Sequence, residues 1–206
     1  MAGAWRSLRR RAASRFEERL PWYILLATIP GALFGALGEA VIESELGEPA
    51  LVAVELMVFG VVLYAADRWS RHRRPLDALG GRDAAAIGMA QALSLMPGVS
   101  RSGITMTAGL GLRLTREAAT RFSFLISIPV VAGAVLYKAW TTFVGGEGLP
   151  AGSGAAFVVG IATSMVTGFW AVWFLLRYVR TRSFAPFVFY RLAAGVVVLS
   201  VFATRL

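Results

Sequence analysis

The sequence predicts an all-α integral membrane protein with about five transmembrane helices and one re-entrant helix hairpin. Of its 206 residues, 57% are hydrophobic and 16% are charged, whereas soluble proteins average roughly 45–50% and 25%. The hydrophobic residues form runs about as long as a bilayer is thick. The basic residues, which give a net charge of +9, lie in short clusters between these runs, as loops beside anionic lipid do. We therefore expect a single membrane domain over residues 1–206 that binds no nucleic acid. The absence of cysteine excludes disulfides, thiolate metal sites and thiol nucleophiles.

The N-terminal half is predicted to begin with an interfacial segment followed by a helical hairpin. Residues 1–20 contain six arginines and no apolar core, so they resemble an interfacial or loop segment more than a signal peptide. Residues 20–42 are long enough to span the membrane. An acidic loop precedes the second span, residues 51–66, which contains one carboxylate, Glu55. A basic loop follows at residues 67–83.

Residues 84–112 are predicted to form the re-entrant hairpin. Two apolar arms, 84–96 and 103–112, flank the polar stretch Pro-Gly-Val-Ser-Arg-Ser. At about 1.5 Å per residue, each arm reaches only about half of the bilayer. A single spanning helix would place proline, glycine and arginine near the middle of the membrane and lose backbone hydrogen bonds in lipid. Two short helices that enter and leave on one side fit the pattern better.

The distribution of basic residues supports re-entry. With a re-entrant hairpin, seventeen basic residues lie on one side of the membrane and only Lys138 and Arg205 lie on the other. With a spanning segment, the division is thirteen against six. The positive-inside rule therefore favours re-entry and a cytoplasmic N-terminus.

Three further spans complete the predicted topology. They cover residues 122–137, 154–176 and 187–203, and they place the C-terminus outside. Two arginines remain at membrane depth, Arg101 in the hairpin and Arg191 in the last span. Because an unpaired charge at this depth costs at least about 2.5 kcal/mol, intramembrane charges are candidates for function.

Arg101 is the strongest of these candidates. Pro97 and Gly98 break the helix just before it, and Gly103 permits a close approach at the start of the second arm. Such a break exposes backbone N–H groups and the positive end of a helix dipole, which together with hydroxyl groups and a guanidinium can bind phosphate. The structural alternative is that the hydroxyl groups satisfy backbone groups at a kink while Arg101 pairs with Glu55.

The sequence around Arg101 resembles the undecaprenyl-pyrophosphate phosphatase family, membrane enzymes linked to bacitracin resistance. The resemblance is carried by AQALSLMPGVSRSGITM and TREAATRFSFLISIP, and it extends to ATIPGALFG at 27–35 and FAPFVFYR at 184–191. It implies two inverted repeats, each with a re-entrant hairpin, in a multi-pass protein of the bacterial inner membrane. The implied reaction cleaves undecaprenyl pyrophosphate to undecaprenyl phosphate and phosphate, which recycles the lipid carrier for cell-wall peptidoglycan.

The resemblance also implies roles for individual residues. The loop at 97–103 is expected to bind the phosphates, with Arg101 as a bidentate donor. Ser100 and Ser102 are expected to bind phosphate rather than attack it, because no base is near them in sequence. Thr105, one turn further, can add a hydroxyl group. Gln91, two turns before the loop, is expected either to orient the site or to pack in the core.

The sequence departs from the family in one respect. The family has an earlier hairpin with a Glu-x-x-x-Glu pair that holds a divalent cation, magnesium or calcium, and these carboxylate ligands are not found here. Glu39 and Glu43 have the spacing but not the neighbouring loop, so we interpret the match as chance. His72, the only histidine, lies in a basic loop and is expected to be solvated. The sequence thus resembles a family member without its first hairpin, which predicts that it binds the substrate but hydrolyses it poorly or not at all by itself.

Two other functions remain open from the sequence. Broken helices and an anion site at mid-membrane are also typical of transporters, so a lipid-phosphate transporter is one alternative. The other is a non-catalytic half-repeat that pairs with an N-terminal half or with a second copy as a homodimer. Release of phosphate from a lipid pyrophosphate separates these alternatives.

Overall fold

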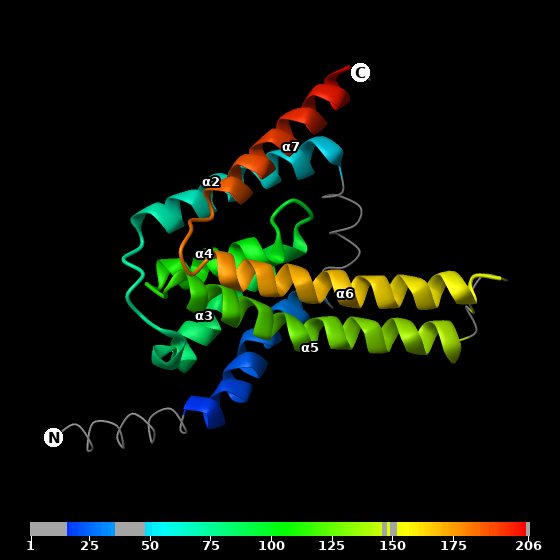
Figure 1. Cartoon of the computed structure of the whole chain (residues 1–206), viewed down its shortest axis with the longest axis horizontal. Helices are drawn as coiled ribbons and strands as arrows, with labels where there is room; N and C mark the ends of the chain where they lie inside the picture. The colour runs from blue at the N-terminus through cyan, green and yellow to red at the C-terminus, as the bar shows by residue number, and fades with distance from the viewer. Residues whose placement is uncertain (1–15, 36–47, 146–147, 149–151, 205–206) are drawn as a thin grey trace.

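The computed structural model describes residues 16–35, 48–145, 148 and 152–204, and the fold of this part is all-α. A helix over residues 16–35 is followed by α2, α3, α4, α5, α6 and α7 (Figure 1). Short 3-10 turns at Leu76–Ala78 and Leu93–Leu95 flank α3. The bounds of the numbered helices are Pro49–Trp69 (α2), Gly81–Ala92 (α3), Arg101–Gly111 (α4), Arg116–Phe143 (α5), Gly154–Tyr178 (α6) and Ala185–Ala203 (α7). Within the described residues there is no β-strand.

Four of these helices are long and apolar enough to cross a membrane: α2, α5, α6 and α7. They contain the predicted spans 51–66, 122–137, 154–176 and 187–203, and α2, α5 and α6 extend beyond these spans by residues that include polar ones. The predicted first span, 20–42, coincides with the helix at 16–35 and then continues into residues outside those described. The predicted interfacial segment, 1–20, is described only from residue 16.

The predicted break at 84–112 is a helical hairpin in which α3 packs against α4. Its two ends are joined by hydrogen bonds. The Arg74 guanidinium donates to the carboxylate of Asp83 at the start of α3, at 2.6 and 3.1 Å, and to the carbonyl of Leu112 beyond the end of α4, at 3.1 Å. The backbone N–H of Thr115 donates to the Arg74 carbonyl. The hydrogen bond from Arg74 holds the pKa of Asp83 below its usual value. The chain therefore enters the hairpin before α3 and leaves it after α4 at the same level of the molecule.

A second contact point joins the long helices at this level. Asp67, buried in the last turn of α2, accepts from Arg116 Nε at 2.5 Å at the start of α5 and from the Phe184 N–H at 3.1 Å just before α7. His72 Nε2 lies 2.8 Å from the Asp67 carbonyl oxygen, and its side chain is half-buried. The expectation that His72 is a solvated loop residue is therefore wrong, because the loop folds back onto α2.

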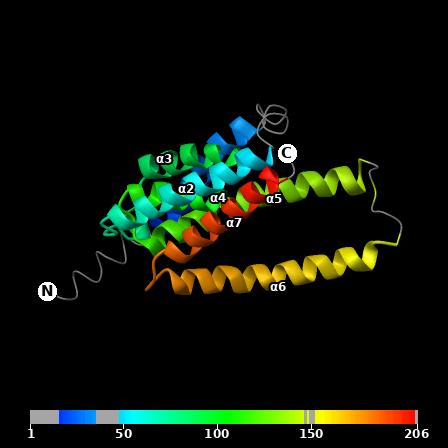
Figure 2. The ribbon, with the colours of Figure 1, turned by 90° about the horizontal axis from the view of Figure 1, so that it is seen from above.

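The core lies between α2, the hairpin, the first half of α5 and the start of α7. Its largest fully buried side chains include Ile87, Leu110, Phe122, Ile126 and Phe184. By contrast, no residue of α6 is fully buried, and Figure 2 shows α6 apart from the other helices along most of its length. The compact part of the molecule is thus the part that surrounds the hairpin.

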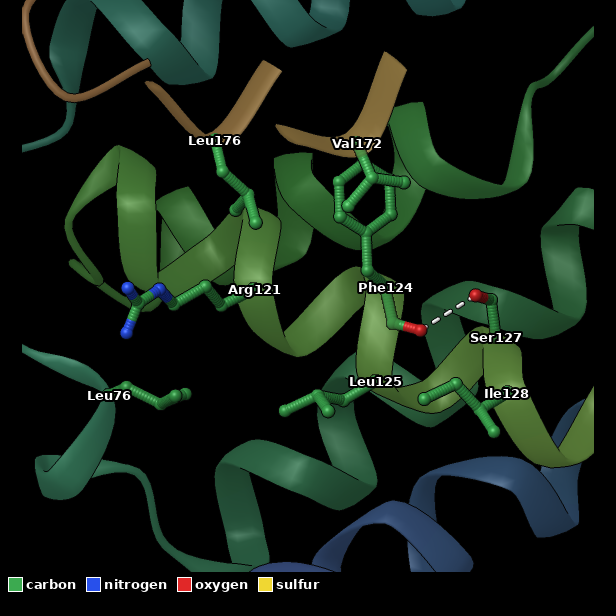
Figure 3. A pocket seen from close by; sticks show the side chains of 8 residues that line it. All are labelled: Leu76, Arg121, Phe124, Leu125, Ser127, Ile128, Val172 and Leu176. Atoms are coloured by element: carbon green, nitrogen blue, oxygen red, sulfur yellow. Dashed lines mark hydrogen bonds between the residues drawn. The ribbon is translucent and has the colours of Figure 1, made fainter. Parts of the chain in front are cut away.

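An apolar groove of about 560 Å³ lies between α5 and α6 (Figure 3). Arg121 is the only charged residue in its lining, and the Ser127 hydroxyl donates to the Phe124 carbonyl rather than toward the groove. No residue of the predicted phosphate loop lines it. The lining residues are Leu76, Arg121, Phe124, Leu125, Ser127, Ile128, Val172 and Leu176.

Candidate anion-binding site

The helix break turns the backbone sharply before Arg101. After the 3-10 turn that ends α3, Met96 is extended, and Ser100 has a φ of 69°, in the left-handed region that costs a non-glycine residue energy. The Ser100 hydroxyl accepts from the N–H of Gly103 at 3.3 Å and so caps α4. We expected the second arm to begin at Gly103, but α4 begins at Arg101. Arg101 is therefore the first residue of the helix and lies at the positive end of its dipole.

Gly98 is held from two sides within the loop. Its N–H donates to Glu55 Oε2 of α2 at 3.1 Å, and its carbonyl accepts from Arg191 Nη2 of α7 at 3.2 Å. A Cβ at this position would lie 2.3 Å from the carbonyl oxygen of Val52 and 2.6 Å from the Cβ of Glu55. Only glycine fits here, because the loop lies directly against α2.

Arg191 is the residue that fastens the loop to the last helix. It is 8% exposed, and it donates through Nε to the carbonyl of Leu56 at 3.1 Å and through Nη2 to the carbonyls of Gly98 and Val99. It forms no salt bridge with any carboxylate of the described residues. The sequence placed Arg191 at membrane depth but did not assign it to the site, since its partners lie more than ninety residues earlier in the chain.

Arg101 is half-buried, and its guanidinium makes no hydrogen bond or ion pair with the described residues. The structural alternative, an ion pair between Arg101 and Glu55, is therefore wrong for this structure. Glu55 instead binds Gly98 through one oxygen, while its buried Oε1 has no partner among the residues described. The Arg101 guanidinium remains available to a ligand.

The hydroxyl groups near the loop divide into two kinds. Thr105 is 1% exposed, and its hydroxyl donates to the Arg101 carbonyl at 2.8 Å and lies 2.7 Å from Ser123 Oγ of α5. It therefore stabilises the helix and its contact with α5. Ser100 is exposed and Ser102 is half-buried, and both lie at the start of α4. Pro97 is also exposed in the loop.

Gln91 joins the hairpin to the helix at 16–35. It is 2% exposed, and its Nε2 donates to the carbonyl of Ala27 at 3.4 Å. A Cβ on Gly31 would lie 2.9 Å from the same Nε2, so the small residue at 31 makes room for the amide. Of the two expected roles, this geometry is that of a buried packing residue.

Comparison with known proteins connects this geometry to a family. The family model of the bacitracin resistance protein BacA matches residues 1–197. The chain belongs to the BacA family. Its four long apolar helices and this membership make it a multi-pass protein of the bacterial inner membrane.

Curated relatives in the BacA family carry the name undecaprenyl-diphosphatase. The chain is 48% identical to that of Anaeromyxobacter sp. (strain Fw109-5) over 95% of its own length and 64% of the relative's. It is 43% identical to that of Pelotomaculum thermopropionicum over 97% and 72%, and 40% identical to that of Gemmatimonas aurantiaca over 100% and 75%. The chain thus spans between about two thirds and three quarters of the length of these relatives.

The divalent cation implied by the resemblance can be tested against the donor set. Among the described residues, no group of three or more histidine, cysteine, aspartate or glutamate side chains lies close enough to hold a metal ion. Glu55 is the one carboxylate that contacts the loop, and Glu39 and Glu43 lie outside the described part. Within the part of the chain that the structure describes, the donors around the loop at 97–103 therefore do not fit a divalent cation site.

Proposed function

We propose that the protein hydrolyses undecaprenyl pyrophosphate to undecaprenyl phosphate and inorganic phosphate, and that the loop at 97–103 binds the pyrophosphate. The observation that supports this most directly is the unpaired guanidinium of Arg101 at the first turn of α4. The names of the BacA relatives give the substrate class. Hydrolysis adds the oxygen of water to the terminal phosphorus, and the bridging oxygen leaves with the lipid phosphate.

The chemistry proposed for Arg101 is charge stabilisation. Negative charge spreads over the phosphoryl oxygens in the transition state, and a guanidinium offers two parallel donors to neighbouring oxygens. The N–H groups in the first turn of α4 have no partners within the helix and add to the same field. A water-poor environment strengthens these interactions.

The remaining loop residues are proposed to shape the binding site. Ser100 and Ser102 are proposed to donate to phosphate oxygens. Pro97 and Gly98 are proposed to hold the turn that precedes α4. Thr105 and Gln91 are proposed to act indirectly, by fixing the hairpin against α5 and the helix at 16–35.

The first prediction is that Arg101→Lys weakens pyrophosphate binding nearly as much as Arg101→Ala does. In both variants the affinity should fall by a factor of tens or more. An ammonium group is a point charge and does not reproduce the planar bidentate fork. Binding of inorganic pyrophosphate to the purified protein in detergent is measured by calorimetry. Arg71→Ala, an exposed arginine in the loop before α3, is the control. Near-wild-type binding by a folded Arg101→Lys variant would leave only a role for charge.

Phosphate release from undecaprenyl pyrophosphate in lipid vesicles tests the reaction itself. The assay is run with magnesium or calcium on this chain and on the Anaeromyxobacter relative. Release that disappears in Arg101→Ala supports hydrolysis by this site. Transfer of the lipid across the vesicle membrane without release would favour the transporter, and release by the relative alone would restrict this chain to binding.

A further inference from the structure

Arg191 carries a buried positive charge for which the structure offers no carboxylate partner. Its guanidinium is surrounded by backbone carbonyls of α2 and the loop, and no described aspartate or glutamate forms an ion pair with it. Carbonyl groups solvate a guanidinium but do not neutralise it. A buried charge without a counter-ion is costly, and at membrane depth such charges mark sites for ions or substrates.

The guanidinium uses only part of its donor capacity. Nε and Nη2 make all three of the hydrogen bonds to carbonyls. Nη1 makes none with the described residues, although a guanidinium has five N–H donors in all. Nη1 is also absent from the buried atoms that lack a partner, which indicates that it is not sealed off on every side.

Nη1 is directed at the first turn of α4. A Cβ added to Gly103 would lie 2.7 Å from Nη1 and 3.2 Å from Ser100 Oγ. The same turn presents the backbone N–H groups of Arg101 and Ser102, which have no partner one turn earlier in the helix. Glycine at position 103 thus lets a cationic donor approach the first turn of α4 closely, at the positive end of the helix dipole.

We propose that Arg191 is a second guanidinium of the anion site: its Nε and Nη2 hold the loop, and its Nη1 binds a phosphate oxygen together with the first turn of α4. The inference rests on the proposed function, because it adds a residue to the same site. The bound anion supplies the missing counter-charge. Two guanidinium groups, Arg101 and Arg191, suit a diphosphate better than a single phosphate, since each phosphoryl group then meets its own donor.

This arrangement also explains why glycine occupies position 103. A methyl group there would push the tip of Arg191 away from the first turn of α4. The tip of an arginine can move, so Gly103→Ala is expected to fold. It therefore alters the direction of Nη1 while it leaves the Arg191 charge in place, which makes it a sharper test than removal of Arg191.

The experiment measures binding of inorganic pyrophosphate and of orthophosphate to the full chain in detergent. We expect Gly103→Ala to weaken pyrophosphate binding about tenfold, the value of one charge-assisted hydrogen bond, and orthophosphate binding less. Gly111→Ala at the end of the same helix, where a Cβ meets nothing within 4 Å, is the matched control and should bind both anions normally. A role in positioning alone would lower both affinities by the same factor.

A double-mutant cycle completes the test. In an Arg191→Gln background, Gly103→Ala should weaken pyrophosphate binding by less than about twofold, because the donor that it displaces is gone. Unchanged pyrophosphate binding in Gly103→Ala, an equal loss for both anions, or the same loss in the Arg191→Gln background would overturn the inference. Should Arg191→Gln fail to fold, the comparison of the two anions in Gly103→Ala decides alone.

Failure of the proposed function has a different signature. If Arg101→Ala binds pyrophosphate like the wild type, the loop is not the anion site, and both conclusions fall. If Arg101→Ala loses binding while Gly103→Ala keeps it, only the role of Arg191 is wrong. Undecaprenyl pyrophosphate in vesicles is then compared with inorganic pyrophosphate, to show whether the site prefers the lipid-linked diphosphate.

Discussion

Glu55 and Arg191 act on the same residue from opposite sides, although they form no salt bridge with each other. The carboxylate accepts the N–H of Gly98 and the guanidinium donates to its carbonyl. Each charge therefore solvates a backbone group that the helix break has left without a helical partner. The position of Arg101 depends on these two contacts, because the loop between Gly98 and α4 is only two residues long.

Substitution of Glu55 should separate its role as an acceptor from its charge. Glu55→Gln keeps an oxygen for the Gly98 N–H, so we expect pyrophosphate binding equal to or tighter than wild type, since one negative charge near the anion is lost. Glu55→Ala leaves the buried N–H unsatisfied at a cost of about 1–3 kcal/mol and should lower both thermal stability and affinity. Calorimetry and thermal unfolding in detergent measure these effects. Equal losses in the two variants would show that the charge itself is required.

At the scale of residues, the sequence predicted features that depend on neighbouring residues and missed contacts between residues far apart in the chain. The helix break follows from Pro97, Gly98 and the polar residues next to them, whereas the role proposed for Arg101 stays a prediction. The Thr105 hydroxyl donates to a carbonyl one turn back in its own helix. The sequence could not decide this, because a Ser or Thr at a kink can donate either to its own backbone or to a ligand. The partners of Arg191 were not predictable, since they depend on how α7 packs against α2.

The elements were predicted more closely than their ends. Apolar runs gave the four long helices, but α5 extends from Arg116 to Phe143 and α2 ends only at Trp69. The extra turns are polar or aromatic and contain Asp67, Arg116 and Glu117, whose ion pairs cross between elements. A hydropathy pattern marks the residues that lipid can cover, so it stops short of the polar turns whose ion pairs join the helices. The lengths of the two hairpin arms were predicted more accurately, because the helix break marks where the first arm ends and the second begins.

The α2 and α7 pair provides a prediction at the scale of elements. A Cβ on Gly195 of α7 would lie 2.4 Å from the Cγ of Met57 and 3.1 Å from the carbonyl of Ala53. We expect Gly195→Ala to destabilise the protein by about 1–3 kcal/mol, the usual cost of overpacking, and to loosen Arg191 on the same helix. Thermal unfolding in detergent measures the change.

The control for this prediction is Gly160→Ala on α6, where a Cβ meets nothing within 4 Å. It should match or exceed wild-type stability, because alanine favours a helix more than glycine does. If the two alanine variants unfold at the same temperature, α2 and α7 do not pack as closely in the membrane protein as they do here.

The whole molecule is organised around one charged end. The loop before α3 and the loop after α4 are hydrogen-bonded to each other through Arg74, Arg113 and Thr115, and both lie near the Asp67 contacts that join α2, α5 and α7. With the residues that flank them, these loops contain eight of the seventeen basic residues that the sequence assigns to one side of the membrane. Charge and geometry thus select the same side for both ends of the hairpin, and on the positive-inside rule that side is the cytoplasm.

Labelling of single cysteines can test this topology, because the chain has no cysteine of its own. Asp77→Cys lies before α3, Arg113→Cys lies after α4, and both positions are exposed. We expect a membrane-impermeant maleimide to label both from the cytoplasmic side. Thr204→Cys, exposed at the far end of α7, should label only from the outside and serves as the control. Arg113 is preferred to Arg116, whose ion pair with Asp67 a substitution would break.

The reason for this expectation is that a spanning hairpin would have to separate residues that are bonded in the structure. Residues 73 and 74 donate their N–H groups to the Arg113 carbonyl at 3.0 and 2.9 Å, which places Asp77 and Arg113 at one level of the molecule. A spanning arrangement would put a bilayer of about 30 Å between them. Labelling of Asp77→Cys and Arg113→Cys from opposite sides would therefore refute both the re-entrant hairpin and the packing of its two ends. It would also refute the placement of Arg101 at the start of α4 within that hairpin.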